Sequence, residues 1–387
     1  MASVSAGLSV GIIGCGVIAP LHVSALASHG AVAQILVHDS DRKAIASLQQ
    51  RCAGCAVPLQ PITDREAFFT QSQVVHICTP HAQHFEDFRS ALQHGAHALC
   101  EKPLAITPLQ LSEMTHLAAA AGACGQWSSC IFQHRFSGLA LALRGALQGG
   151  ALGSLQAVDV FGRCTRTSAY YRSAAWRGTW QGEGGGVAIN QMIHLLDLML
   201  WMTGGCTRLR AALGQRHLAD VIEVEDCLQA EGYLGKHAIP LRVDLANDQQ
   251  THWLNRLTLH LDQGDICYTP DAGGSFLAGS THPGLARLES EAGAKAASDQ
   301  GIQVKGEYGD LHAAQIHQWL DAILTGSAPA VPIAEAAHTA AWVLACYRSQ
   351  AAGQAWVTVD DALTAYNPPS LKPILSSSSA LQLWSAE

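Results

Sequence analysis

Length, composition and charge place this chain among globular proteins. Its 387 residues are 48% hydrophobic and 14% charged, with a formal net charge of −8, which excludes a disordered chain and leaves room for two domains. The sequence contains no run of Lys or Arg, which argues against nucleic acid or an anionic membrane as the main partner. The longest apolar runs, such as LLDLMLWM, fall short of the ~20 residues of a membrane span. No signal peptide is evident, so we expect a cytoplasmic protein.

The twelve cysteines are scattered through apparent strands and helices. Without an export signal, a chain of this size is expected to keep them as buried free thiols and not as disulfides. Cys52 and Cys55 have metal or redox spacing, but no second pair lies near them in the sequence. No H-x-x-x-H motif or His/Cys cluster falls near the predicted crevice described below, so no metal site is expected despite 19 histidines.

The first structural motif is a dinucleotide-binding turn. The run LSVGII at residues 8–13 predicts a buried strand, and Gly14-Cys-Gly16-Val-Ile-Ala19 follows it before a helical pattern. In a G-x-G-x-x-G/A turn the first glycine bends the chain, and the second lets the backbone approach a pyrophosphate. The third position is small for helix–strand packing, and the helix N-terminus faces the phosphates.

An acidic residue ends the second predicted strand, AVAQILVHD. A carboxylate at Asp39 is placed to bind the ribose hydroxyls and repels a 2′-phosphate, which favours NAD over NADP. The nearby Arg42 leaves NADP open. Asp39 can instead cap the helix that starts near Asp41, which is compatible with either cofactor.

Two further strand-like runs end in polar residues. VVHIC leads into Thr79-Pro80-His81 with His84 beyond, and AHALC leads into Glu101-Lys102-Pro103. Strands alternating with helices predict a parallel, doubly wound sheet, whose ligand lies beyond the carboxyl ends of the strands. Gly14, Asp39, Thr79 and Lys102 are therefore expected along one crevice.

The stretch GGGVAINQMIHLLDLMLW (184–201) predicts a glycine turn followed by an amphipathic helix. Asn190, His194 and Asp197 are spaced by four and three residues, so on a helix they form one polar line. Such a line either satisfies itself within a core or faces a pocket. Asp197 either orients His194 or pairs within the fold.

The pattern beyond Gly125 changes to strand-like runs separated by turns, followed by two helices. We expect a dinucleotide-binding domain at 1–125, a substrate-binding and oligomerisation domain at 126–367 and a loosely attached tail at 368–387. The Ala-, Gly- and Ser-rich segment 271–300 is expected to be a long loop or insertion.

Together these motifs resemble the Gfo/Idh/MocA oxidoreductases. The resemblance runs through IIGCGVIAPLHVSAL, ICTPHAQH, ALCEKPLAIT, WRGTWQGEGGGVAINQMIHLLDLMLW, VEDCLQAEGYL and YGDLHAAQIHQWLDAILTG. It implies an α/β protein with an N-terminal Rossmann domain and a C-terminal α/β domain built on a large, mostly antiparallel open sheet. Because that sheet often forms the oligomer interface, a homodimer or homotetramer is expected.

The resemblance also implies the site residues. Lys102 and His194 correspond to the family residues beside the reacting hydroxyl; His194 is the expected proton acceptor and Lys102 orients and polarises the oxygen, although sequence does not separate these roles. His22, Glu225 and His312 match family positions and are expected to be structural or domain-bridging. The expected cofactor-binding residues are Gly14, Gly16, Val17, Ile18, Asp39, Thr79, Pro80, His84, Glu101, Lys102, Trp176 and Arg177.

Position 190 departs from the family pattern. Many relatives carry Asp four residues before the histidine, and an amide at Asn190 cannot accept a proton, so a relay through it is excluded. Asn190 can still bind a substrate hydroxyl. Further candidate substrate contacts are Arg135, Tyr171 and Arg172, because polar groups beside aromatic rings suit a polyol.

We therefore expect an NAD(P)-dependent dehydrogenase or reductase that acts on a secondary hydroxyl or carbonyl of a sugar, inositol or related polyol. A non-catalytic, dinucleotide-sensing regulator of the same fold is one alternative. An NAD-retaining glycosidase or epimerase is another.

Overall fold

The computed structural model describes residues 7–248, 253–271, 274–296 and 307–360, which form two compact units. In its described parts the first unit comprises 7–105, 113–133 and 307–336, and the second contains the rest.

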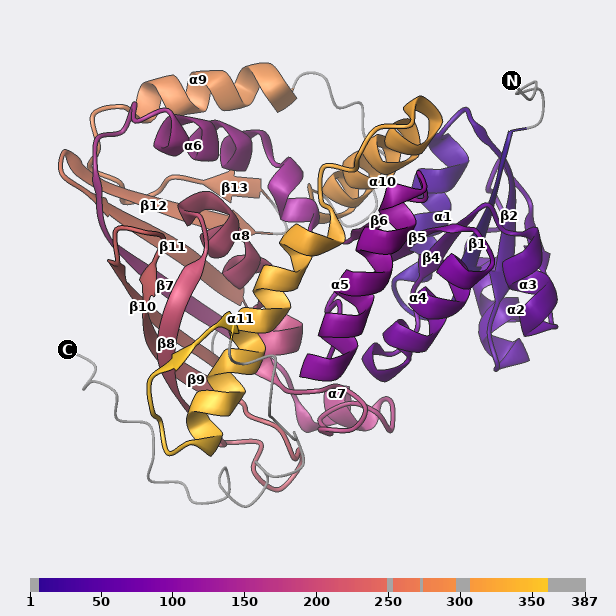
Figure 1. The fold of residues 1–387 in the computed structure, drawn as a ribbon, viewed down its shortest axis with the longest axis horizontal. Coiled ribbons are helices and arrows are strands. Elements are labelled where there is room, and N and C mark those ends of the chain that lie inside the picture. The colour runs from indigo at the N-terminus through magenta and orange to yellow at the C-terminus, as the bar shows by residue number, and fades with distance from the viewer. Residues whose placement is uncertain (1–6, 249–252, 272–273, 297–306, 361–387) are drawn as a thin grey trace. The chain divides into compact units, whose positions relative to one another are not determined.

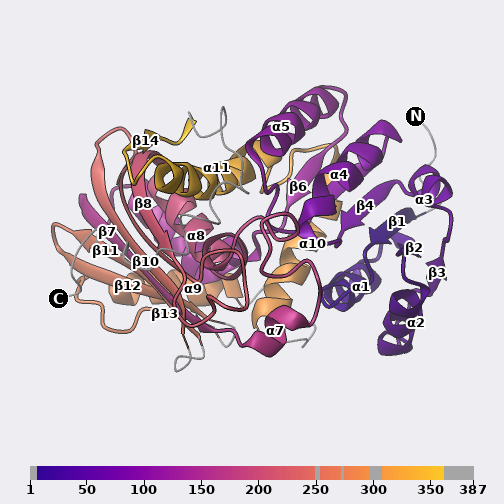
Figure 2. The ribbon, with the colours of Figure 1, turned by 90° about the horizontal axis from the view of Figure 1, so that it is seen from below.

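The first unit is built on six parallel strands in the order β3-β2-β1-β4-β5-β6. The sheet lies between two helical layers, with α4 and α5 on one side and α1, α2 and α10 on the other (Figures 1 and 2). This is the predicted doubly wound sheet. Its strands are β1 (Leu8–Ile13), β2 (Val32–His38), β3 (Leu59–Pro61), β4 (Val74–Ile77), β5 (His97–Cys100) and β6 (Ser128–Cys130). Its helices are α1 (Ala19–Ser28), α2 (Arg42–Arg51), α3 (Arg65–Gln71), α4 (His84–Gln93), α5 (Pro108–Ala123) and α10 (Glu307–Thr325).

Helix α10 completes the core of this unit from far along the chain. Ile316, Trp319 and Leu320 are fully buried in one apolar cluster with side chains of β1, β2 and α1. The sequence predicted one boundary, at residue 125. In the structure the first unit also includes residues 307–336, from late in the chain. Segment 106–112, in turn, belongs to the second.

The second unit contains an eight-stranded sheet in the order β13-β12-β11-β7-β10-β9-β8-β14. Its pairs are antiparallel except for β7 with β10, which confirms the expected mostly antiparallel sheet. The strands are β7 (Leu155–Thr165), β8 (Cys206–Gly214), β9 (Cys227–Leu234), β10 (Ile239–Asp248), β11 (Trp253–Leu261), β12 (Gly264–Asp271), β13 (Gly274–Phe276) and β14 (Val357–Thr358). The helices are α6 (Gly138–Gln148), α7 (Ser168–Arg172), α8 (Ile193–Thr203), α9 (Leu285–Ala296) and α11 (Ile333–Ala351).

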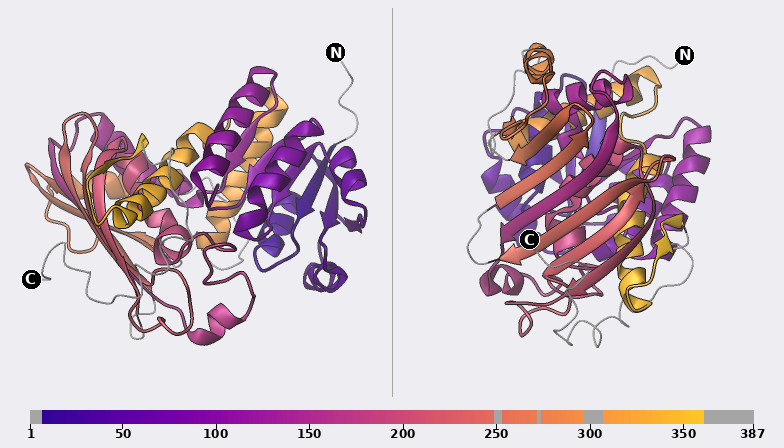
Figure 3. Two further views of the ribbon diagram at one scale, coloured as in Figure 1. Left: turned by 60° about the horizontal axis from the view of Figure 1, so that its bottom comes forward. Right: turned by 90° about the vertical axis from the view of Figure 1, so that its left-hand side faces the viewer.

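Among the residues that the structure describes, helices cover only one face of this sheet. Along β7, buried and partly exposed side chains alternate: Val158 and Val160 are buried, and Phe161 and Arg163 are partly exposed. Figure 3 (right) shows the sheet from the side on which no helix lies in front of it.

The segment expected to be a long loop contains regular structure. Residues 274–276 form β13 and 285–296 form α9, which packs against α6 (Figure 1). The small residues of this segment favour a loop, but alanine is also the best helix former. The predicted tail at 368–387 lies outside the described residues.

All twelve cysteines are free thiols, seven of them buried, as expected. Among the described residues no helix is long and apolar enough to cross a membrane. No group of three or more potential metal ligands occurs there either.

Candidate active site

The predicted crevice residues of the first unit lie at one edge of its sheet. Gly14 follows β1, Asp39 follows β2, Thr79 lies two residues beyond β4 and Glu101 follows β5. Because all these strands are parallel, their carboxyl ends meet at the same edge, where an open α/β sheet binds its ligand.

The glycine-rich turn has the shape that a dinucleotide requires. Gly14 adopts φ +91°, and a Cβ there would lie 2.6 Å from the Cys78 main chain, so only glycine fits. A Cβ on Gly16 would meet nothing within 4 Å, and Val17 is 72% exposed, so the outer side of the turn is open. Ile18 is the residue before α1, which begins at Ala19. The turn therefore fits a bound pyrophosphate.

Asp39 joins this turn to the second strand. Its Oδ2 accepts the Cys15 main-chain N–H at 2.8 Å, and its Oδ1 accepts that of Asp41 at 2.8 Å. Asp41 is itself the cap of α2 and accepts from Lys43. The capping role considered for Asp39 thus belongs to Asp41, and Asp39 is held against the glycine turn.

His84 holds two of the strand ends together. Its Nδ1 lies 2.8 Å from the Pro103 carbonyl oxygen and its Nε2 lies 2.9 Å from that of Thr79. The Thr79 hydroxyl donates to Asp87 at 2.7 Å, and Pro80 leads into the short helix His81–Gln83. His84 therefore positions main chain on both sides of the expected cofactor site.

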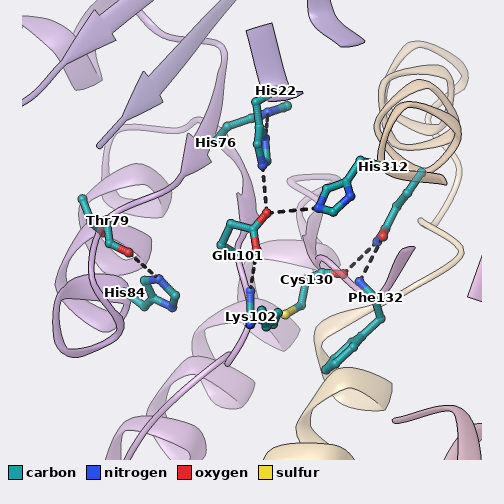
Figure 4. A network of polar contacts seen from close by, with 10 residues as sticks. His22, His76, Thr79, His84, Glu101, Lys102, Cys130, Phe132 and His312 are labelled. Carbon is teal, nitrogen blue, oxygen red and sulfur yellow. Dashed lines mark hydrogen bonds and ion pairs between the residues drawn. The ribbon is translucent and has the colours of Figure 1, made fainter. Parts of the chain in front are cut away.

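A buried histidine–carboxylate cluster lies behind Lys102 (Figure 4). Glu101 Oε1 is 2.9 Å from His22 Nε2 and 3.6 Å from His312 Nε2, and His22 Nδ1 is 2.9 Å from His76 Nδ1. The other carboxylate oxygen accepts the Lys102 main-chain N–H at 3.2 Å. These side chains come from α1, β4, α10 and the end of β5, so the cluster fixes the backbone that carries Lys102.

The charge state of this cluster follows from its contacts. Burial alone would raise the pKa of the Glu101 carboxyl, but the hydrogen bonds and charge of His22 and His312 outweigh it and hold that pKa well below its usual range. Burial, with His22 beside it, lowers the pKa of His76 well below its ordinary value. Glu101 is therefore an ionised carboxylate and His76 is neutral.

The helix that carries His194 is broken near its start. Residues Val187–Gln191 form a π-helix, and α8 begins only at Ile193. Asn190 therefore lies in the π-turn and His194 in the first turn of α8. The polar line predicted from the spacing thus spans two helical segments, with Asn190 in the first and His194 and Asp197 in the second. His194 is partly exposed, and its ring meets that of His134 edge-on with centroids 5.3 Å apart.

Glu225 shapes the glycine turn in front of this helix. Its carboxyl group accepts the main-chain N–H of Gly186 at 2.9 Å and of Ala188 at 3.2 Å, and the Tyr347 hydroxyl at 3.1 Å. A Cβ on Gly186 would lie 1.8 Å from the Glu225 carbonyl oxygen, so only glycine allows this approach. Burial raises the pKa of the Glu225 carboxyl to about 7, against the opposing effect of these hydrogen bonds.

A second buried carboxylate, Glu183, was not predicted. It accepts the main-chain N–H of Gly178 and the side-chain amide of Asn190, whose amide also lies 3.3 Å from the Tyr170 hydroxyl. Many relatives carry Asp at this position. Here Asn190 stands in its place and is held beside the carboxyl group of Glu183. The sequence feature that could have indicated Glu183 is its place as a lone acid within the glycine-rich stretch QGEGGG.

Asp197 pairs within the fold. Its oxygens accept Arg135 Nε at 2.8 Å and Nη2 at 2.7 Å, and the Thr339 hydroxyl at 2.8 Å. Arg135 is 4% exposed. This buried bidentate pair gives Arg135 a structural partner where a substrate contact was expected, and it decides between the two roles left open for Asp197.

The remaining candidates lie around α7. Tyr171 is buried, and its hydroxyl accepts from Asn247 at 2.9 Å, whereas Arg172 is exposed. Arg177 donates to the Tyr170 hydroxyl, and its guanidinium lies 4.7 Å from the Trp176 ring centre. Tyr170, which sequence reasoning passed over in favour of Tyr171, is the tyrosine that contacts Asn190.

Comparison with known proteins identifies both units. Residues 8–127 match the family model described as an oxidoreductase family with an NAD-binding Rossmann fold, and residues 140–266 match the GFO/IDH/MocA C-terminal domain. D-glucoside 3-dehydrogenase of Escherichia coli is 29% identical over 207 residues, which is 52% of this chain and 56% of that protein. Rhizopine catabolism protein MocA of Rhizobium meliloti is 24% identical over 273 residues, 70% of this chain and 77% of that protein. The chain thus aligns with little more than half of the first of these relatives.

Solved structures agree on the fold. The WlbA dehydrogenase from Bordetella pertussis, in complex with NADH and UDP-GlcNAcA, superposes with a TM-score of 0.75 at 21% identity, covering 92% of this chain and 98% of that one. Levoglucosan dehydrogenase in complex with NADH gives 0.74 at 19% identity, covering 91% and 99%. The first unit is therefore an NAD-binding Rossmann domain.

The histidine–carboxylate cluster predicts strong energetic coupling. Glu101→Gln and His22→Ala should each lower the free energy of unfolding by about 3 kcal/mol, because each leaves a buried polar partner unmatched. The double variant should lose at least about 1 kcal/mol less than the sum of the two, because the second change removes a group already without its partner. Denaturant titrations measure this cycle. Additivity within about 0.5 kcal/mol would contradict the coupling.

Glu225 predicts a dependence of stability on pH. Its folded pKa of about 7 exceeds the ordinary value of 4.5, so its stabilising contribution is complete below pH 4.5 and is lost as pH rises through 7. That contribution is on the order of 3 kcal/mol. Glu225→Gln cannot ionise, so the stability difference between wild type and variant should shrink across this window in chemical denaturation. A difference independent of pH would show that the group does not titrate there.

Proposed function

Because the chain belongs to the GFO/IDH/MocA family of oxidoreductases, we propose that it transfers hydride between a nicotinamide cofactor and a secondary hydroxyl or carbonyl of a sugar, inositol or related polyol. The observation that carries the proposal is the placement of Lys102. It follows β5 at the ligand-binding edge of the NAD-binding sheet, on main chain held by Glu101 and His84.

The proposal gives each of three residues its own part in the reaction. A bound nicotinamide supplies the hydride acceptor or donor. During oxidation the His194 imidazole takes the hydroxyl proton as the carbinol C–H bond breaks, and during reduction it returns that proton. Lys102 orients and polarises the same oxygen through its ammonium group. Asn190, held by Glu183, binds a neighbouring substrate hydroxyl.

The second unit is proposed to mediate self-association as well. The uncovered face of its sheet presents Phe161 with Arg163 and Arg256 against its ring, a mixture of apolar and charged groups typical of interfaces. We propose that the chain forms a homodimer or homotetramer through this face.

Substitution at the two proposed catalytic residues tests the reaction. Polyols are screened by nicotinamide absorbance, and Lys102→Met and His194→Asn should then lower kcat by about 10²- to 10⁴-fold. NADH binding should stay within about twofold in His194→Asn, which leaves the glycine turn, Asp39 and Lys102 unchanged. His116→Asn, at an exposed position of α5, is the matched control. Unchanged kcat in His194→Asn, or no turnover of any polyol by NADH-binding wild type, would refute the proposal.

Asp39 tests the cofactor preference. NAD and NADH should raise the melting temperature of wild type more than NADP and NADPH do, because the carboxylate repels a 2′-phosphate. Asp39→Arg should shift the preference toward NADP(H) by about tenfold or more. Asp39→Asn keeps an acceptor for Cys15 and controls for damage to the turn. A wild type that prefers NADP(H) would overturn this assignment.

A further inference from the structure

Two arginines of the second unit share one aromatic ring. The guanidinium carbon of Arg166 lies 4.7 Å from the centre of the Tyr170 ring, and that of Arg177 lies 4.3 Å from it. Trp253 and Trp176 stack on the same two guanidinium groups at 4.8 and 4.7 Å. Aromatic faces stabilise each cation but do not neutralise it, so two positive charges are concentrated around Tyr170.

Both guanidinium groups retain hydrogen-bond donors. Arg166 Nη1 donates to the Thr165 carbonyl oxygen at 3.1 Å, and Arg177 Nη1 donates to the Tyr170 hydroxyl. The Nε of each is buried and has no hydrogen-bond acceptor among the described residues. Buried donors of this kind carry a free-energy cost until an acceptor reaches them.

The cluster adjoins the proposed substrate site. Asn190 lies in the π-turn that leads into α8 and His194, and its amide is 3.3 Å from the Tyr170 hydroxyl. The Arg166–Tyr170–Arg177 cluster is thus one hydrogen bond away from a residue proposed to bind substrate.

The chemistry of the cluster selects its ligand. A planar guanidinium fork matches the paired oxygens of a carboxylate or phosphate, and two such forks favour a full negative charge over a hydroxyl. The chain as a whole carries a formal charge of −8, so general attraction of anions does not account for the arrangement.

We propose that Arg166 and Arg177 form a subsite for an anionic group, a carboxylate or phosphate, on the polyol substrate. This deepens the function proposed above: the preferred substrates are acidic sugars or sugar phosphates and not neutral polyols. Arg177, which the resemblance implied as a cofactor-binding residue, serves the substrate in this proposal.

Binding to the NADH-loaded protein tests the subsite. Glucuronate, glucose 6-phosphate and glucose are titrated against wild type, Arg166→Gln, Arg177→Gln and Arg287→Gln, the last an exposed residue of α9 that serves as control. Wild type and the control should bind glucuronate or glucose 6-phosphate at least tenfold more tightly than glucose. Whichever of the two binds more tightly shows whether the subsite prefers a carboxylate or a phosphate. The two subsite variants should lose that preference while their glucose affinity stays within about twofold.

NADH titrations of the same four proteins separate the two possible anions. Unchanged NADH affinity in Arg166→Gln and Arg177→Gln supports a substrate subsite. A tenfold loss in either variant assigns that guanidinium to the cofactor pyrophosphate and overturns the proposal, as does equal binding of acidic and neutral sugars by wild type. If acidic sugars bind through the arginines but none is oxidised, the subsite stands and the dehydrogenase proposal fails.

Discussion

The buried carboxylate of Glu101 is the constraint on which the cofactor-binding unit depends. An ionised group with no access to water is tolerated only when hydrogen bonds and opposite charge surround it. Here those partners come from α1 and α10, and the main chain of Lys102 supplies another. One anion therefore joins the helix of the glycine turn, a helix from late in the sequence and the backbone of the proposed catalytic lysine.

The second unit uses the same device at its own functional turn. Glu225 and Glu183 are fully buried and bind main-chain N–H groups of the glycine-rich stretch, so the turn is held by buried carboxyl groups. The π-turn Val187–Gln191 comes next in the chain, and the Glu225 carboxyl group binds main-chain N–H groups at its start. Asn190 and His194 are aimed by that turn, which makes their geometry a property of residues distant in sequence.

Sequence predicted what depends on local pattern. The glycine turn and the strand ends at Gly14, Asp39, Thr79 and Lys102 follow from apolar runs that stop at polar residues, and the structure places them as expected. The sequence did not predict contacts between residues that are far apart in the chain. Arg135 and Asp197 are 62 residues apart, and no sequence feature near either residue indicates a buried ion pair. Gly186, just before the π-turn, likewise bonds to Glu225, which is 39 residues further along the chain. The roles of individual site residues stay predictions until tested.

The contribution of α10 bears on how the molecule is made. The NAD-binding sheet is finished early in the chain, yet its core lacks Ile316, Trp319 and Leu320, and Glu101 lacks His312, until the chain has been synthesised past residue 320. Nascent residues 7–133 thus expose an apolar face of β1, β2 and α1 to the ribosome surface and to chaperones while the second unit is still being translated. The Rossmann unit, first in sequence, is among the last parts of the protein to become complete.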